Sequence, residues 1–200
     1  MTVLDMERRD CRLSSNKRLE IVYQVTKAIE EMHNAGILNR DIKTDNVMFD
    51  YPDEPRTGKS NQRAVVFDFG IATKKDPQTQ EEREQLKLVC GTPEVFAPEI
   101  FEIDRYSVAQ EIYTIGALMY EVFSNREFRN LRGAQFSEFP QRIKEEIPRP
   151  SEVAQVDRDI EDIIMMAIAR DPAKRFRSAT QMREVIFDAL IRKTNGEIEV

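Results

Sequence analysis

The segment from Val108 to Phe123, VAQEIYTIGALMYEVF, places the strongest constraint on the fold of this chain. Its apolar side chains occupy nearly every face of a helix, and such a helix is stable in water only when other elements surround it. Three further segments, over 19–32, 160–168 and 182–190, repeat apolar residues at helical spacing and can therefore cover it. The pattern predicts a mainly α-helical domain built around one central helix.

The composition is that of one globular domain spanning 1–200, because 200 residues with 40% apolar content can bury a single sizeable core. The net charge of −6 disfavours a nucleic-acid-binding protein, which normally carries a basic face. No run of apolar residues is long enough to predict a membrane span, and the start, MTVLDMERRD, is too charged for a signal peptide. With only Cys11 and Cys90, neither a disulfide framework nor a cysteine metal site is predicted. We therefore expect a cytoplasmic protein.

Two strand-like runs, NVMF and RAVVFDF, are separated by the turn-rich segment DYPDEPRTGKSNQ and predict a β-hairpin. Pairing of these runs would bring Asp41, Asn46 and Asp68 to one cleft. Two carboxylates and an amide form a hard-oxygen set that suits Mg²⁺, and Lys43 could neutralise a transferring phosphoryl group. The alternative for this stretch alone is a charged, solvated turn.

Five motifs follow one another along the chain: NRDIKTDN, DFG, GTPEVFAPE, EIYTIGALMYE and DPAKRF. In this order they resemble the motifs of eukaryotic-type (Hanks-type) Ser/Thr protein kinases. The resemblance runs from about residue 2 to residue 190 and covers the helical C-terminal lobe of that family. It implies a mainly α kinase-like C-lobe with a small β-hairpin, a catalytic loop at 37–49, an activation segment at 68–99 and a helical subdomain at 100–190.

The resemblance implies a role for each residue of the cleft. Asp41 would be the catalytic base, and Asn46 and Asp68 would hold Mg²⁺. Lys43 would contact the γ-phosphate of ATP, and Thr92 would brace Asp41 and Lys43. The implied cofactors are thus ATP and Mg²⁺, and the implied partner is a protein substrate that presents Ser or Thr.

Residues outside the cleft also acquire roles from the resemblance. Val47, Met48 and Phe49 would form the floor of the adenine pocket. Glu99 would pair with Arg175 and fasten the activation segment to the helical core. Lys43 together with the GTPE motif is typical of Ser/Thr kinases rather than tyrosine kinases.

The sequence departs from the family pattern at the nucleotide site. No two glycines lie two residues apart, so the glycine-rich loop that covers ATP is absent from the sequence, as is the strand lysine that pairs with a helix glutamate. The resemblance therefore implies that the N-terminal lobe is absent from this chain and that another segment or a partner completes the site. The alternative function is a truncated pseudokinase that acts as a non-catalytic protein-binding module.

Two substitutions fall on the residues that normally anchor the catalytic loop. Asn39 replaces the family's histidine, which packs beneath the DFG phenylalanine, here Phe69, and Glu111 replaces an aspartate that captures loop backbone N–H groups. Glutamate is one methylene longer, and an asparagine amide can donate. We expect Asn39 and Glu111 to be direct partners, with Glu111 still accepting from the loop backbone. Drift in a chain that no longer needs a precise loop is the alternative.

The activation segment has no phosphorylatable residue between Thr79 and Thr92, and Leu88 occupies the usual phosphothreonine position. Arg40, which would grip such a phosphate, is expected to meet an acidic side chain instead. The candidates are Glu81, Glu82 and Glu84; the alternative is a solvated acidic helix.

Three single residues remain open. Cys90 is either a redox handle or, as its burial would favour, an inert thiol. Glu121 either selects a basic residue in a peptide or is an exposed glutamate at a helix end. His33, the only histidine, is interpreted as structural.

Overall fold

The computed structural model describes residues 13–50 and 63–194. The predictions that concern the start of the chain, Cys11 and the tip of the hairpin lie outside these residues. Seven α-helices are present in the described part: α2 (Ser15–Asn34), α3 (Gln80–Lys87), α4 (Val108–Ser124), α5 (Phe139–Arg142), α6 (Pro150–Val153), α7 (Arg158–Ala167) and α8 (Ala179–Lys193). Short 3₁₀ turns are η1 (Thr44–Asn46), η2 (Pro93–Val95), η3 (Phe136–Glu138) and η4 (Pro172–Lys174).

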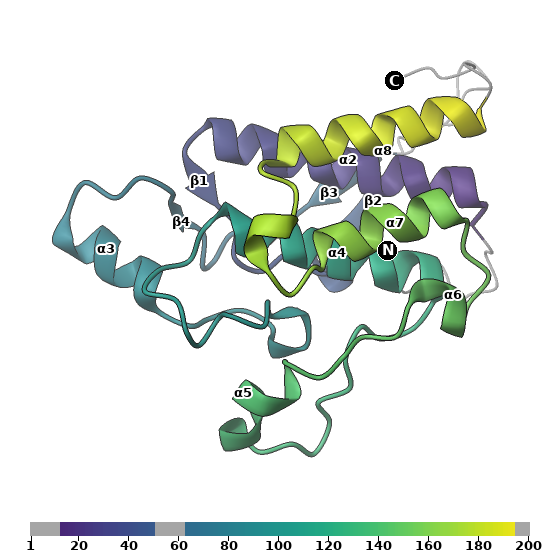
Figure 1. Ribbon diagram of the computed structural model, residues 1–200. Helices are drawn as coiled ribbons and strands as arrows, with labels where there is room; N and C mark the ends of the chain where they lie inside the picture. Colours follow the sequence, from purple (N-terminus) through teal and green to yellow (C-terminus); the bar gives the residue numbers. More distant parts are fainter. Residues whose placement is uncertain (1–12, 51–62, 195–200) are drawn as a thin grey trace.

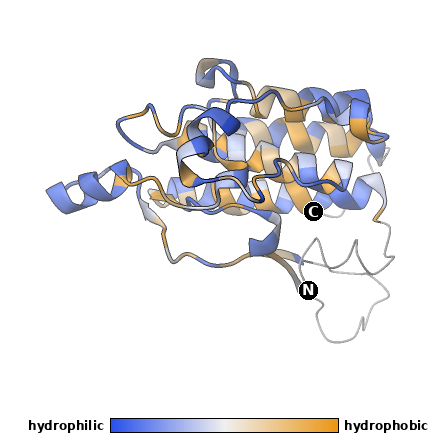
Figure 2. Cartoon of the chain, turned by 90° about the horizontal axis from the view of Figure 1, so that it is seen from below, coloured by the Kyte–Doolittle hydropathy of each residue, from blue (hydrophilic) through white to orange (hydrophobic). Residues whose placement is uncertain are grey.

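Helix α4 lies at the centre of the fold, as its sequence predicts. Every residue from Gln110 to Phe123 is buried except Glu121, which is half-buried. Helices α2, α7 and α8 pack against α4, and α2 and α8 run side by side (Figure 1). Figure 2 shows apolar residues concentrated along these packed helices. The prediction of a mainly helical domain is confirmed.

Gly116 allows α4 and α7 to approach each other closely. A Cβ atom at this position would lie 2.6 Å from the Cβ of Ala167 and 2.8 Å from Cγ2 of Ile168, well inside normal contact distance. Only glycine therefore permits this close packing of α4 against α7.

The predicted hairpin is present as strands β2 (Val47–Asp50) and β3 (Arg63–Val66), which pair antiparallel. Val47 faces Val66, and both side chains are buried, whereas the neighbouring pair Met48 and Val65 is exposed. This alternation is expected where one face of a hairpin packs on a core, here against α2. A second two-stranded pair joins β1 (Ile37–Leu38) to β4 (Thr73–Lys74).

A second, smaller apolar cluster lies beneath the segment that follows β4. Its seven buried members are Leu38, Leu86, Phe96, Ile100, Tyr106, Leu131 and Ile143. Leu86 belongs to α3, which otherwise projects from the edge of the molecule with a hydrophilic surface (Figures 1 and 2). Thr79 caps α3 by accepting from the N–H of Glu82. Leu86 packs α3 onto this cluster, and the N–H of Tyr106 donates to the Leu86 carbonyl at 2.8 Å.

Candidate active site

The candidate site lies on the loop between β1 and β2, at the point where the hairpin begins. Arg40 and Asp68 both have positive φ angles, 74° and 64°, in a region that side-chain-bearing residues seldom adopt. Such strain persists only where the surrounding structure enforces it, and it clusters at functional sites. Arg40 directly precedes the predicted catalytic base Asp41, and Asp68 is one of the two predicted metal-binding residues.

Asp41 lies at the centre of a polar network formed by Thr92, Asn46 and Lys43. Its Oδ1 accepts from the Thr92 hydroxyl at 2.7 Å. Its Oδ2 accepts from Nδ2 of Asn46 at 3.0 Å and lies 3.1 Å from Nζ of Lys43. Lys43 Nζ also donates to Thr92 Oγ1 at 2.9 Å. The carboxylate is therefore fixed by three neighbours and is still 14% exposed, so a substrate hydroxyl can reach it.

Asp68 reaches the same end of the hairpin through its backbone. The N–H of Phe67 donates to the carbonyl of Asn46 at 3.0 Å, which places Asp68 beside the start of β2. Its exposed carboxylate accepts only from the N–H of Gly70 among the described residues. The side chain of Asn46 donates to Asp41 through Nδ2. Its carboxamide oxygen makes no hydrogen bond among the described residues.

Asn46 and Asp68 supply hard oxygen atoms, the kind of ligand that Mg²⁺ prefers. Within 13–50 and 63–194, no three His, Cys, Asp or Glu side chains gather closely enough to hold a metal ion. Mg²⁺ characteristically keeps several waters and takes one or two protein ligands together with phosphate oxygens. The amide oxygen of Asn46 and the carboxylate of Asp68 match that requirement.

The three residues predicted to line the adenine pocket do not all present their side chains at the surface. Val47 is 0% exposed and belongs to the main core, so its side chain does not reach the surface. Met48 is 42% exposed, and Phe49 pairs through its backbone with Ala64. Phe69 of the DFG motif is also exposed, at 52%. Met48 and its exposed cross-strand neighbour Val65, together with Phe69, are thus apolar side chains available to a ligand or a covering segment.

The expected pairing of Asn39 with Glu111 is wrong. Glu111 is fully buried and accepts from the N–H of Arg40 at 2.7 Å, so the expected capture of a loop N–H is present. Its second oxygen lies 2.6 Å from Nε2 of His33, which must donate because a carboxylate has no proton to give. The extra methylene thus extends Glu111 to His33, which supports the structural interpretation of that histidine.

Asn39 instead stabilises the catalytic loop locally. Its Oδ1 accepts from the N–H of Asp41 at 3.0 Å, a short-range contact that suits asparagine in a turn. Its buried Nδ2 has no hydrogen-bond partner among the described residues. Asn39 therefore supports the backbone of the catalytic residue directly.

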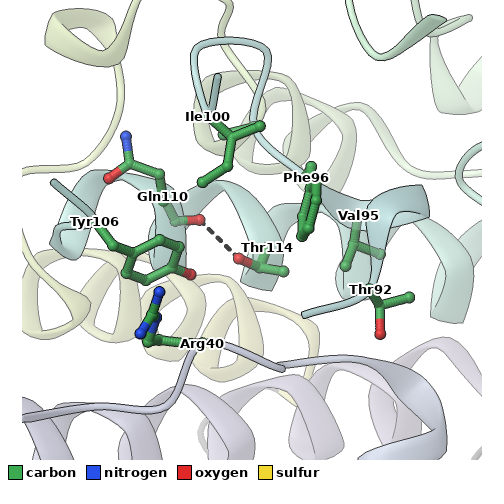
Figure 3. Close-up of a pocket in the computed structure, with 9 residues that line it drawn as sticks. Arg40, Thr92, Val95, Phe96, Ile100, Tyr106, Gln110 and Thr114 are labelled. Carbon is green, nitrogen blue, oxygen red and sulfur yellow. Dashed lines mark hydrogen bonds between the residues drawn. The ribbon is translucent and has the colours of Figure 1, made fainter. Parts of the chain in front are cut away.

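Arg40 does not pair with an acidic side chain, contrary to expectation. Its guanidinium donates to the carbonyl of Gln85 at 2.8 Å and to that of Leu88, at the C-terminal end of α3. It also lies 5.3 Å from the ring centre of Tyr106, at one side of a small, largely apolar cavity (Figure 3). The partial negative charge at the end of α3 attracts this cation. Glu81 and Glu84 are exposed, as in the alternative interpretation, whereas the half-buried Glu82 pairs with Lys74 at 2.7 Å.

Glu99 and Arg175 form the expected ion pair between the activation segment and the helical core. Two parallel contacts of 2.7 Å join the guanidinium to the carboxylate. Arg175 also donates to the carbonyl of Ala109, at the start of α4, and stacks 4.8 Å from the ring centre of Tyr113. Paired guanidinium and carboxylate groups of this geometry are among the strongest polar contacts in proteins.

Glu121 is neither an exposed helix-end residue nor free to meet a peptide. Its carboxylate accepts from the Thr44 hydroxyl at 2.9 Å and from the N–H of Phe128 at 3.1 Å. Burial raises the pKa of this carboxyl group above its usual range. Glu121 therefore joins the catalytic loop to the segment that follows α4.

Cys90 is half-buried, and burial raises the pKa of its thiol. Because the thiolate is the reactive form, this shift favours the inert alternative over a redox role.

Arg129, a buried arginine beside the site, is not indicated by any sequence pattern. It lies in the weakly periodic segment after α4, where isolated charged residues usually face solvent. Its contacts depend on how loops from three parts of the chain meet, and no local pattern encodes that arrangement.

Comparison with known proteins places these features in a family. The protein kinase domain model matches residues 2–187. Serine/threonine-protein kinase pkn3 of Myxococcus xanthus is 29% identical over 176 residues, which cover 86% of this chain and 31% of that protein. PknB of Mycobacterium tuberculosis is 25% identical over 198 residues, covering 98% of this chain and 29% of that protein. The chain therefore spans about a third of the length of these relatives.

A solved structure shares the fold. The kinase PK-1 of the Cydia pomonella granulovirus superposes with a TM-score of 0.70 at 19% identity, covering 90% of this chain and 63% of that one. No helix in the described part of the chain is long and apolar enough to cross a membrane.

Proposed function

Because the chain belongs to the protein kinase family, we propose that it forms the catalytic lobe of a Ser/Thr protein kinase. The reaction is transfer of the γ-phosphate of ATP to a hydroxyl group of a protein substrate. The network that joins Asp41, Thr92, Lys43 and Asn46 carries this proposal, because it fixes a carboxylate beside a lysine cation and an amide.

Asp41 acts as the base in this proposal. As the substrate oxygen attacks the γ-phosphorus, its proton passes to the Asp41 carboxylate and the bond to the departing ADP oxygen breaks. The hydroxyl of Thr92 and the amide of Asn46 hold the carboxylate in one orientation. A fixed orientation contributes to rate because the reacting groups need not be reordered at each turnover.

In this proposal, Lys43 and the Mg²⁺ held by Asn46 and Asp68 would offset the negative charge of the phosphate groups. The side chain of Lys43 is 25% exposed, so its ammonium group can face a phosphoryl oxygen while remaining near Asp41. Asn46 and Asp68 would hold Mg²⁺, which supplies positive charge to the phosphate oxygens when bound. Met48, rather than Val47, would contact the adenine ring, because only the former is exposed.

We further propose that another segment or a partner covers the nucleotide. The sequence contains no glycine-rich loop and no recognisable strand lysine, and Met48 and Phe69 present apolar surface at the mouth of the site. The same observation favours the second candidate function, a non-catalytic binding module. The two functions differ in one property, namely whether phosphate moves from ATP to protein.

A transfer assay separates the two candidates. The chain is incubated with Mg²⁺, γ-labelled ATP and Ser/Thr-containing protein, alone and together with an amino-terminal kinase lobe. Label on phosphoserine or phosphothreonine that Asp68→Asn abolishes and Asp76→Asn preserves supports the kinase. Asp76 is a matched control because it is exposed and takes no part in the hydrogen bonds of the network. Absence of transfer under both conditions would favour the binding module.

A further inference from the structure

Two consecutive residues, Phe128 and Arg129, lie between the two loops of the candidate site. The N–H of Phe128 donates to Oε1 of Glu121 at 3.1 Å, and Oε2 of Glu121 accepts from the Thr44 hydroxyl at 2.9 Å. Thr44 begins the η1 turn, two residues before Asn46. One end of this link is therefore attached to the catalytic loop.

The guanidinium of Arg129 forms the other end of the link. One nitrogen, Nη1, donates to the carbonyl of Glu94 at 3.1 Å and to that of Phe96 at 2.9 Å. The other terminal nitrogen donates to the Tyr113 hydroxyl of α4. These two carbonyls belong to the η2 turn and the residue after it, directly beyond Thr92.

Arg129 is bound in an unusual way for a buried cation. It is 7% exposed, and no carboxylate among the described residues forms an ion pair with it. Its charge is balanced by carbonyl dipoles and by ring faces, with ring centres at 4.7 Å for Phe128 and 5.6 Å for Tyr113. Burial accordingly lowers the pKa of Arg129. Because its guanidinium binds backbone carbonyls instead of a carboxylate, Arg129 fixes the path of the backbone at Glu94 and Phe96 rather than neutralising a negative charge.

We propose that Arg129 is a positioning residue for the protein-substrate side of the site, because its guanidinium fixes segment 94–96 relative to the catalytic loop through Glu121 and Thr44. This inference rests on the proposed function, in which the segment after Thr92 receives the substrate chain. It differs from the role of Arg175, which fastens the chain three residues beyond Phe96, through Glu99. Both arginines stack on the ring of Tyr113.

The first test measures amide hydrogen exchange in the 200-residue chain and needs no catalytic activity. Arg129→Met keeps an apolar side chain of similar length against the two rings and removes both carbonyl contacts. The amides of Val95 and Phe96, which close the η2 turn, should exchange roughly 10- to 100-fold faster, as expected when hydrogen bonds from a charged donor are lost. Exchange in α2 and α8 should remain unchanged.

Two variants sharpen this measurement. Arg132→Met is the matched control, because that side chain is 77% exposed and its one ion pair within 13–50 and 63–194 is with the exposed Glu127. It should leave the η2 amides as they are in the wild type. Arg129→Lys should restore part of the protection, since an ammonium group can reach a carbonyl but cannot form the guanidinium fork. Unchanged η2 exchange in Arg129→Met, or faster exchange spread evenly over the helices, would overturn the positioning role.

The second test is kinetic and separates this inference from the proposed function. Arg129→Met should raise the KM for the protein substrate several-fold and leave the KM for ATP and the kcat near wild type, because Thr92 still holds Asp41. Equal losses in all three quantities would overturn the inference. If the wild type transfers no phosphate while the η2 amides still loosen, the proposed function fails and the positioning of 94–96 by Arg129 stands.

Discussion

Replacement of Glu111 by alanine removes the anchor between the central helix and the catalytic loop. The carboxylate is 0% exposed and accepts from the N–H of Arg40 and from His33 Nε2. Glu111→Ala leaves both donors buried without a partner, and each orphaned donor costs about 1–3 kcal/mol. The expected loss is therefore about 2–6 kcal/mol, a large part of the roughly 5–15 kcal/mol that stabilises a typical domain.

Double-mutant cycles identify the partner of Glu111. The cycle of Glu111→Ala with His33→Ala should give a coupling energy of about 1.5–3 kcal/mol, because the two side chains share one charge-assisted hydrogen bond at 2.6 Å. The cycle of Glu111→Ala with Asn39→Ala should give a clearly smaller value, since Asn39 accepts from the N–H of Asp41 instead.

Urea unfolding followed by far-UV circular dichroism measures each free energy of unfolding. The variants should share one m-value, because a changed slope would mean that the unfolded or native ensemble had changed as well. A coupling to Asn39 that equals or exceeds the coupling to His33 would refute the assignment of Glu111.

Two further predictions concern the activation segment. Arg175→Met should destabilise the fold by about 3–5 kcal/mol in the same urea assay, because it leaves the largely buried Glu99 carboxylate without its cation; a loss below about 1 kcal/mol would contradict this. The hydrogen bond from Lys74 lowers the pKa of Glu82 to about 2 from 4.5, so its stabilising contribution is present above pH 4.5 and is lost as the pH falls toward 2. Glu82→Gln should therefore make the decline of Tm between pH 4.5 and pH 2 shallower than in the wild type, and parallel curves would count against the shift.

The elements that the sequence predicts well are those in which one residue pattern repeats. Helix α4 follows from its apolar faces, and the β2–β3 hairpin follows from two short runs around a turn-rich segment. The pairing of Glu99 with Arg175 is implied by the resemblance to the kinase motifs, and the structure contains it. For the helix and the hairpin, the determining information lies in residue type and spacing.

The details that the sequence does not predict depend on how far a side chain reaches. Asn39 and Glu111 are both near the loop backbone, yet the longer glutamate extends to His33 and the asparagine bonds to its own chain. Arg40 likewise finds carbonyls at the end of α3 rather than carboxylates on its exposed face. Several chemically suitable hydrogen-bond partners exist for each of these side chains. The distance in the folded structure decides which partner is bound, and residue type alone does not reveal it.

The single-turnover rate of phosphate transfer in Asp41→Asn tests the central claim most directly. The variant keeps the shape of the side chain and an oxygen that can accept from Thr92, so nucleotide binding and the fold should be preserved. Loss of the base should slow the chemical step by about 10²- to 10⁴-fold when Mg²⁺-ATP and protein substrate are saturating. A single-turnover rate within a few-fold of wild type would contradict the assignment of Asp41 as the base and, with it, the proposed phosphoryl-transfer site.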